Sequence, residues 1–390
     1  MRARQALPPL ILGVFAVAAA GCDDFRPAKH NTAATVPAAT TAAPPVAAVV
    51  PALTPPTTTD ATAGDPSAAT LTPGVSAGAL AATTPMAQSI EAAEATGPAP
   101  KSATPSPLLI KVEVLLDRAH FSPGVIDGRP GENLTNALAA YAKAHGTEGG
   151  GAIDAGALSA LTTQDKGAIT QAYQITPEDE AGPFIGKVPV GFVEQAKLPA
   201  LGYTDPVQEL ASKFHMSQGL LKALNPGADF TKAGTTLVVV QPSVAPLPKV
   251  ARVEIDKAAN QVRAMDGAGK VLAAFPATVG STERPAPDGT WAVKVVAPRP
   301  DYTYDPKKLT FGPASKGVLT VKPGPNNPVG STWIALTKET YGIHGTPEPD
   351  KVGKAASHGC VRLTNWDAAT LGKAVSKGTP VVFVGQTTKS

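Results

Sequence analysis

Two short motifs near the end of the chain carry the most information about its fold: YGIHGT at residues 341–346 and SHGCVRL at residues 357–363. In the second motif, Cys360 lies two residues after His358 and two residues before Arg362. If this stretch is extended, the three side chains share one face, because side chains alternate along a strand. A thiolate is the nucleophilic form of cysteine, and a nearby imidazole or guanidinium favours it. The motif therefore predicts a cysteine nucleophile, beside an arginine that can hold a substrate carboxylate.

Two other interpretations of Cys360 remain open at this point. A lone cysteine is most often a small buried hydrophobe, and this one is the only cysteine after Cys22. The second alternative is a metal site formed by His344, His358 and Cys360. Zinc would need a fourth ligand or an open water position, and the sequence contains no HExxH motif. We favour the nucleophile and expect no metal.

The residues around the motifs predict a mostly-β domain. Short runs with partial alternation occupy residues 252–256, 261–265, 271–279, 291–297, 332–336 and 381–384. One helix is expected after Thr364, because a threonine cap is followed three residues later by Asp367. Its buried face consists of Ala368, Leu371 and Val375. The expected domain is therefore β-rich with a single packed helix, over residues 250–385.

These motifs, with GPNNPVG at residues 324–330, resemble the signature of the L,D-transpeptidase (YkuD) catalytic domain. The resemblance implies a β-sandwich-like fold with the cysteine in a cleft under a loop. It also implies that Cys360 is the nucleophile and His344 its general base, oriented by the carbonyl of Gly345. His358 and Gly359 are then expected to line the oxyanion region. The residues expected to bind substrate are Arg362, Ser357, Thr346 and Tyr341.

The same resemblance implies a two-step reaction without metal or organic cofactor. Cys360 attacks the bond between a dibasic third residue and D-Ala in a stem tetrapeptide, and an acceptor amine resolves the thioester. An amine of another stem gives a 3→3 cross-link. With water as the acceptor, the enzyme would be an L,D-carboxypeptidase. With a lipoprotein lysine as the acceptor, it would be a protein-attachment enzyme. The family resemblance further implies covalent inactivation by carbapenems.

Two upstream segments resemble small wall-binding domains. Residues 108–184 contain FSPGVIDG at 121–128 followed by a predicted helix, an order similar to helical peptidoglycan-binding-like domains. The alternative is a packing domain without ligand. Residues 201–241 contain two predicted helices, Asn225-Pro226 and a final strand, which resemble an α+β LysM domain whose family binds N-acetylglucosamine-containing glycans. The usual first strand is expected to be replaced here by residues 202–205. A non-catalytic, anchored wall-binding protein is therefore a second hypothesis from a different functional class.

The beginning of the chain predicts export and anchoring. Arg2 and Arg4 precede an apolar stretch over residues 6–21, which is typical of a signal peptide. The sequence AAGC at 19–22 resembles a bacterial lipobox, so residues 1–21 are expected to be removed and Cys22 to be lipidated. An ordinary signal peptide that leaves Cys22 unmodified is the alternative. The expected location is the cell envelope, lipid-anchored and facing the periplasm.

Composition predicts a long tether between anchor and folded segments. Of the 85 residues from Asp23 to Pro107, 24 are Ala, 15 Thr and 14 Pro, so residues 22–107 are expected to form a disordered linker. The formal net charge is +3, from 34 Lys+Arg against 31 Asp+Glu, without a basic stripe. That balance argues against a nucleic-acid partner. The expected partners are stem peptides and glycan strands of peptidoglycan, a membrane through Cys22, and a lipoprotein acceptor if protein attachment is the reaction.

Overall fold

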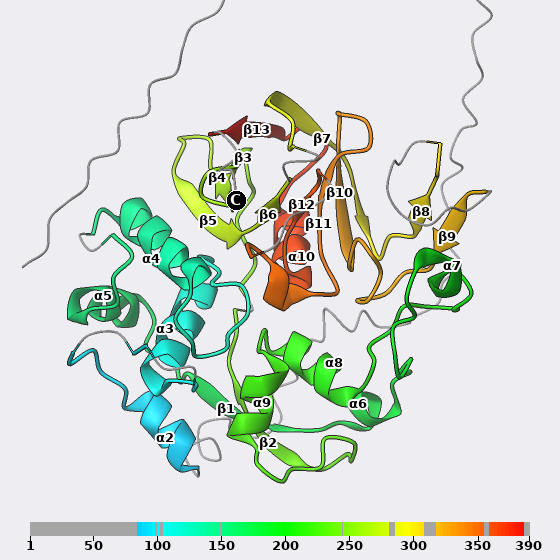
Figure 1. The fold of residues 1–390 in the computed structure, drawn as a ribbon. Helices are drawn as coiled ribbons and strands as arrows, with labels where there is room; N and C mark the ends of the chain where they lie inside the picture. Colours follow the sequence, from blue (N-terminus) through cyan, green and yellow to red (C-terminus); the bar gives the residue numbers. More distant parts are fainter. Residues whose placement is uncertain are drawn as a thin grey trace, which may run out of the picture. The chain divides into compact units, whose positions relative to one another are not determined.

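A computed structural model describes residues 84–97, 100–101, 104–147, 150–243, 245–280, 285–307, 317–354 and 359–385. All of these belong to one compact unit, residues 63–390. The predicted signal peptide, Cys22 and most of the predicted linker lie outside the described residues. Figure 1 shows the arrangement of the described elements.

The described helices are α2 (Pro85–Glu91), α3 (Pro107–Arg118), α4 (Glu132–His145), α5 (Ala155–Gln164), α6 (Pro177–Ala181), α7 (Phe192–Gln195), α8 (Pro206–Lys213), α9 (Gln218–Leu224), the 3-10 helix η2 (Pro349–Lys351) and α10 (Asn365–Ala374). The strands are β1 (Thr170–Gln174), β2 (Thr236–Val240), β3 (Arg252–Asp256), β4 (Gln261–Met265), β5 (Val271–Pro276), β6 (Thr278–Val279), β7 (Gly289–Pro298), β8 (Tyr302–Tyr304), β9 (Leu319–Val321), β10 (Thr332–Leu336), β11 (Gly342–His344), β12 (Val361–Arg362) and β13 (Pro380–Val384).

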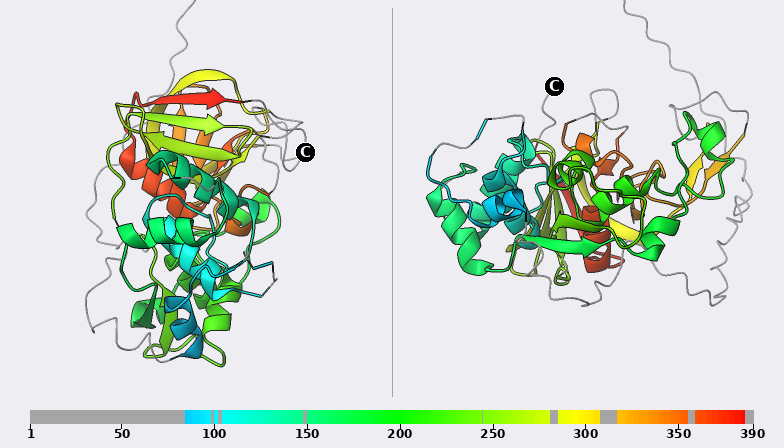
Figure 2. Two further views of the ribbon diagram at one scale, coloured as in Figure 1. Left: turned by 90° about the vertical axis from the view of Figure 1, so that its left-hand side faces the viewer. Right: turned by 90° about the horizontal axis from the view of Figure 1, so that it is seen from below.

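One nine-stranded sheet dominates the last third of the chain. Its order is β5-β4-β3-β13-β7-β10-β11-β12-β6. The strands at the two ends, β5 and β6, are consecutive in sequence and separated only by Ala277, so the sheet curls until it is nearly closed (Figures 1 and 2). The prediction of a mostly-β domain is confirmed: nine strands form this curled sheet, and β8 and β9 pair with each other as a separate two-stranded sheet.

Helix α10 packs against this sheet as its sequence pattern predicts. The Thr364 hydroxyl caps it by accepting a hydrogen bond from the Asp367 amide at 3.1 Å. Its buried Leu371 belongs to the same apolar cluster as Ile334 of β10. Gly372 allows a close approach, because a Cβ atom there would lie 3.1 Å from the Thr332 side chain. The single packed helix of the predicted domain is thus present.

The upstream helices share one apolar core across both predicted wall-binding segments. That cluster includes Leu116 of α3, Leu138 of α4, Leu210 of α8 and Leu221 of α9. It also contains β2, whose antiparallel partner is β1, with Thr170 opposite Val240. The strand that pairs with β2 thus comes from residues 170–174, rather than being replaced by residues 202–205. Only Thr170 of β1 is buried, so the strand has no apolar alternation that would predict it.

Helix α2 lies inside the stretch that composition assigns to the linker. Thr84 caps it, with its hydroxyl accepting from the Ala87 amide at 3.2 Å, and Ile90 is fully buried. The Glu91 carboxylate accepts hydrogen bonds from the amides of Ile169 and Thr170 at 3.0 and 2.8 Å. The structure therefore differs from the prediction of a linker reaching residue 107, because composition averages over one short apolar helix face.

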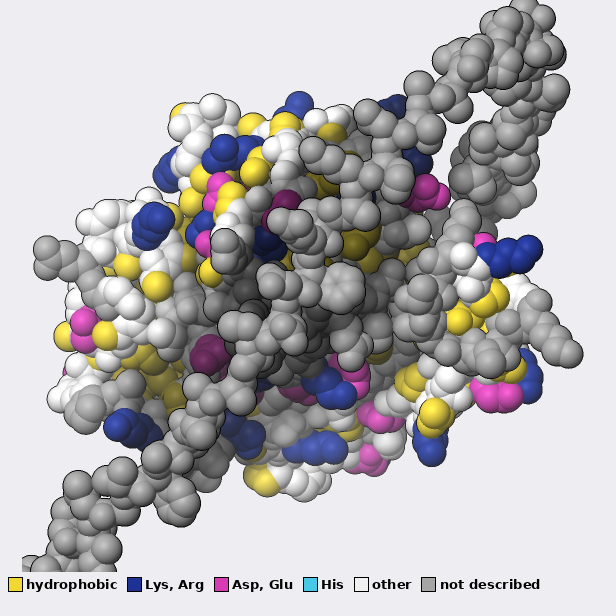
Figure 3. All heavy atoms as spheres, turned by 45° about the horizontal axis from the view of Figure 1, so that its top comes forward, with side chains coloured by type: hydrophobic (Ala, Val, Ile, Leu, Met, Phe, Trp, Pro, Cys, Tyr) yellow, Lys and Arg dark blue, Asp and Glu magenta, His cyan; other side chains and the backbone are white. Residues whose placement is uncertain are grey.

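The surface carries mixed charge. Figure 3 shows basic and acidic side chains interspersed on the face it presents, as the small net charge predicts. Among the described residues, no helix combines the length and apolar character that crossing a membrane requires.

Candidate active site

Strands β11 and β12 bring the two sequence motifs together. They pair in parallel, with Ile343 opposite Val361 and His344 opposite Arg362. Ile343 and Val361 are buried in the apolar core, so alternation turns His344 and Arg362 to the opposite face of the sheet. Cys360 directly precedes β12, at a bend outside the regular strand, and so lies next to this pair along the chain. The fold therefore brings the His344 imidazole to a thiol and a guanidinium that lie 16 and 18 positions further along the sequence.

The imidazole of His344 is held as a neutral base. Its Nδ1 lies 2.7 Å from the Gly345 carbonyl oxygen. A carbonyl only accepts hydrogen bonds, so the proton is on Nδ1 and the lone pair on Nε2. Burial, together with the Arg362 charge, lowers the pKa of His344 to about 4. Trp333 stacks on the ring with centroids 5.3 Å apart. His344 is thus uncharged at neutral pH and able to take up a proton at Nε2.

Cys360 is half-buried at a sharp bend of the backbone. Its Sγ donates a weak hydrogen bond to the Thr340 carbonyl at 3.7 Å, and Thr340 has a φ of 66°. Gly359, immediately before the cysteine, has a φ of 108°, and a Cβ there would lie 3.4 Å from the ring of Tyr341. Glycine therefore leaves the backbone beside the sulfur open, with Tyr341 packed against it.

Tyr302 of β8 is a site residue that the sequence analysis missed. Burial raises its pKa to about 12, with further contributions from Cys360 and Tyr304, while Arg362 opposes the rise. Both Cys360 and Arg362 therefore act electrostatically on its hydroxyl. The signal that could have found it is compositional, since two tyrosines within three residues stand out in a chain with 5% aromatics.

A polar contact behind the site supports Gly345. Asn365, at the start of α10, accepts from the Ser331 amide at 3.0 Å and donates to the Pro325 carbonyl at 3.1 Å. A Cβ at Gly345 would lie 2.2 Å from Asn365 Oδ1, and one at Gly330 would lie 2.1 Å from the same atom. The GPNNPVG motif and α10 therefore clamp the backbone carbonyl that orients His344.

The clamp makes a prediction about Gly330, which has a φ of 65°. Gly330→Ala should destabilise the fold by about 3 kcal/mol, combining the cost of a left-handed backbone with overpacking. Gly378→Ala is the matched control, because Gly378 also has a positive φ of 91° but has open space where the Cβ would go. Urea unfolding should show a loss of only about 1 kcal/mol for the control. Equal losses for both variants would contradict the clamp.

The remaining predicted site residues fall into two groups. Ser357, His358 and the lipidation candidate Cys22 lie outside the described residues. Thr346 is buried, and its hydroxyl accepts from the Glu348 amide at 3.3 Å, within a turn. Among the described residues, no group of three or more His, Cys, Asp or Glu side chains is arranged to hold a metal ion.

Comparison with known proteins connects this site to one family. The model of the YkuD L,D-transpeptidase catalytic domain matches residues 251–383. YqjB of Bacillus subtilis, an inferred L,D-transpeptidase, is 32% identical over 143 residues, 35% of this chain and 73% of that protein. YbiS of Escherichia coli, named as a probable L,D-transpeptidase, is 28% identical over 195 residues, which cover 48% of this chain and 63% of that protein.

The overlap with other relatives is partial. YkuD of Bacillus licheniformis, an inferred L,D-transpeptidase, is 43% identical over 76 residues, 19% of this chain and 46% of that protein. The chain therefore spans 46% to 63% of the length of the first curated relatives it matches. An L,D-transpeptidase structure from Mycobacterium smegmatis aligns with a TM-score of 0.29 at 18% identity, over 40% of this chain and 76% of that one.

Proposed function

Because this chain belongs to the L,D-transpeptidase (YkuD) family, we propose that it is a peptidoglycan L,D-transpeptidase with Cys360 as nucleophile. The observation that carries the proposal is the pairing of His344 with Arg362, next to Cys360, on the face of the sheet opposite the core. A neutral imidazole beside a thiol and a guanidinium is suited to acyl transfer from a substrate that carries a carboxylate.

The first step forms a thioester. The Sγ–H proton of Cys360 passes to Nε2 of His344, and the sulfur attacks the carbonyl carbon of the third stem residue. The bond from that carbon to the D-Ala nitrogen breaks, and the leaving amine takes the proton back from His344. Backbone N–H groups near Gly359 are the proposed oxyanion donors, and Arg362 is proposed to hold the substrate carboxylate.

The second step transfers the acyl group. An acceptor amine gives its proton to His344 and attacks the thioester, which releases Cys360 as a thiol. We propose a side-chain amine of a neighbouring stem as the acceptor, which gives a 3→3 cross-link. Tyr302 is a further candidate for contact with the substrate, since Cys360 and Arg362 both act electrostatically on its hydroxyl.

We also propose that the chain is exported and held in the envelope through a lipidated Cys22. An acylated cysteine with a long tether would let the folded part reach the wall from the membrane, since several acyl chains anchor stably. Membrane fractionation beside Cys22→Ala tests this, because the variant should leave the membrane fraction.

The proposed function is tested by mass spectrometry of disaccharide-tetrapeptide incubated with the protein. Since α2 packs into the core, any truncated protein should begin before Thr84. We expect dimers that have lost one D-Ala, and no such product with Cys360→Ala. If tripeptide monomers are the only product, the activity is that of a carboxypeptidase and not cross-linking. No reaction with either protein would overturn the proposal and favour the anchored wall-binding hypothesis.

A further inference from the structure

We infer that Asn326 and Gln208 are positioning residues for His344, and that they act through the loop formed by the GPNNPVG motif at residues 324–330. The inference rests on the proposed function, because His344 is its general base. Gln208 belongs to residues 201–208, which lie upstream of the catalytic domain in sequence. These upstream residues are thereby given a role in the reaction itself.

The loop is attached to the upstream residues through the backbone of Leu201. The Leu201 amide donates to the Pro323 carbonyl at 2.9 Å, and the Leu201 carbonyl accepts from the Asn326 amide at 3.0 Å. Leu201 is fully buried. A Cβ at Gly324 would lie 2.1 Å from the Leu201 carbonyl oxygen, so only glycine permits this approach of the two backbones. The beginning of the loop is therefore docked on the upstream residues.

The Asn326 side chain adds a second attachment to the same residues. It is only 3% exposed, and its Nδ2 donates to the Gly202 carbonyl at 2.7 Å. Asn326 and Gln208 also exchange two hydrogen bonds between their amide groups, at 2.9 and 3.0 Å. Gln208 is held in turn, because its Oε1 accepts from the Thr204 amide at 2.7 Å. Removing the Asn326 amide would leave these buried partners unsatisfied, which is costly, so the amide fixes the position of the loop.

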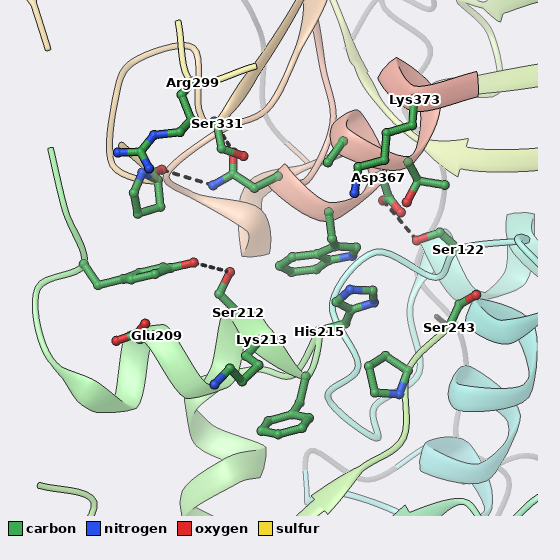
Figure 4. A pocket seen from close by; sticks show the side chains of 18 of the residues that line it. Ser122, Glu209, Ser212, Lys213, His215, Ser243, Arg299, Ser331, Asp367 and Lys373 are labelled. Carbon is green, nitrogen blue, oxygen red and sulfur yellow. Dashed lines mark hydrogen bonds between the residues drawn. The ribbon is translucent and has the colours of Figure 1, made fainter. Parts of the chain in front are cut away.

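Helix α8, which carries Gln208, is connected to α10 by this loop. A cavity of about 730 Å³ lies between the two helices beside the loop. Figure 4 shows Glu209 and Ser212 of α8 on one side of it, and Asp367 and Lys373 of α10 on the other. Atoms that face an empty space make no contact across it. At this place the upstream residues therefore hold α10 through the loop and not by direct packing.

The connection continues from the loop to the catalytic histidine. The carbonyl of Pro325, the residue before Asn326, accepts from Asn365 Nδ2 at 3.1 Å. Asn365 Oδ1 lies against Gly345, where a Cβ would be only 2.2 Å from it. The Gly345 carbonyl oxygen is 2.7 Å from His344 Nδ1. A shift of Asn326 would therefore release Asn365, and with it the carbonyl that orients the imidazole.

This carbonyl matters for catalysis because it selects the tautomer of His344. The hydrogen bond at one ring nitrogen decides which nitrogen carries the proton. With the proton on Nδ1, Nε2 is able to take up the thiol proton of Cys360. Without the carbonyl, the proton can reside on Nε2, and that tautomer cannot accept the thiol proton there. Loss of the Asn326 contacts should therefore lower kcat and leave KM unchanged, because the proposed substrate-binding residues lie elsewhere.

The variant Asn326→Ala tests the inference, with Asn225→Ala as the matched control. Asn225 is also buried, at 8% exposed, and its side chain also makes three hydrogen bonds, all to Leu221 and Val238 of the upstream residues. We would label the histidines of the full-length proteins with ¹⁵N and determine the tautomer of His344 from the shifts of its two ring nitrogens at neutral pH. His344→Gln assigns the signals.

We expect the Nδ1–H tautomer in the wild-type protein and in Asn225→Ala, and a mixture with the Nε2–H tautomer in Asn326→Ala. In Asn326→Ala, kcat for D-Ala release from disaccharide-tetrapeptide should fall roughly tenfold or more, with KM unchanged to within about twofold. Asn225→Ala should keep the wild-type kcat. Gln208→Leu is a second variant for the case that Asn326→Ala does not fold. It removes the partner amide at a half-buried position and should change the tautomer in the same direction.

Three outcomes would overturn the inference. The first is a His344 that keeps the Nδ1–H tautomer in folded Asn326→Ala or, where that variant does not fold, in Gln208→Leu. The second is an equal change of tautomer or kcat in Asn225→Ala, because general destabilisation would then explain both. The third is a lower kcat without a change of tautomer, because Asn326 would then act on another part of the reaction.

Failure of the proposed function is seen separately, as absence of D-Ala release by the wild-type protein. The tautomer of His344 is measured without turnover. A change of tautomer in Asn326→Ala, in a protein that releases no D-Ala, would leave the positioning of His344 standing and remove only the proposed reaction.

Discussion

Replacing Cys360 with alanine should lower the rate of D-Ala release by at least about 1,000-fold, because removal of a catalytic nucleophile leaves only binding and oxyanion stabilisation. Cys360→Ser should fall almost as far. A serine hydroxyl is far less acidic than a thiol, so the neutral His344 removes its proton much less readily. The measurement is the initial rate of D-Ala release from disaccharide-tetrapeptide, with wild-type and variant proteins at equal concentration.

A carbapenem gives a second readout for the same residue. The wild-type protein should gain the mass of one drug molecule, and Cys360→Ala should keep its own mass. Unfolding curves of the two proteins should coincide within about 1 kcal/mol, since Cys360 is only half-buried. Retained D-Ala release by Cys360→Ala would remove the cysteine from the mechanism. A mass gain by the alanine variant would show that the drug reacts elsewhere.

The sequence predicts much of the catalytic domain because its signals are local. Thr364 and Asp367 mark the start of α10 within four residues, and the strands from Arg252 to Met265 show a partial alternation of apolar residues. The two motifs predict the chemistry because each functional side chain lies within a few residues of another. What they do not predict is the parallel register that sets His344 beside Arg362.

Contacts between distant residues account for what sequence reasoning missed. Asn365 reads as an ordinary first residue of a helix, yet its side chain fills the space beside Gly330 and Gly345. Tyr302 is far from Cys360 in sequence, and only the fold brings it within electrostatic range of the thiol. The partner of β2 comes from residues 170–174, more than sixty positions upstream, and no local pattern encodes such a pairing.

The pH dependence of catalysis should show that His344 is neutral down to unusually low pH. Its pKa of about 4, lowered first by burial, places the acid limb of kcat/KM near pH 4, rather than near the ordinary histidine value of about 6.5. His344→Gln should lower kcat/KM by roughly 1,000-fold, because the amide cannot accept the thiol proton. An acid limb near pH 6.5 in the wild-type protein would mean that His344 is not the buried neutral base.

The pH dependence of the free energy of unfolding should reveal the lowered pKa of His344 independently of activity. The folded pKa of His344 lies below its unfolded value, so the unfolded chain takes up a proton between about pH 6.5 and pH 4 while the folded chain does not. Stability from this group is therefore complete above the unfolded pKa and is lost as the pH falls toward the folded pKa. Between pH 7 and pH 5, a single such histidine removes about 2 kcal/mol from the free energy of unfolding. Urea unfolding at pH 7 and at pH 5 measures this loss. The free energy of unfolding of His344→Gln should fall by about 2 kcal/mol less than that of the wild-type protein. If the two proteins lose the same amount, burial does not lower the pKa of His344, and the neutral-base mechanism loses its physical basis.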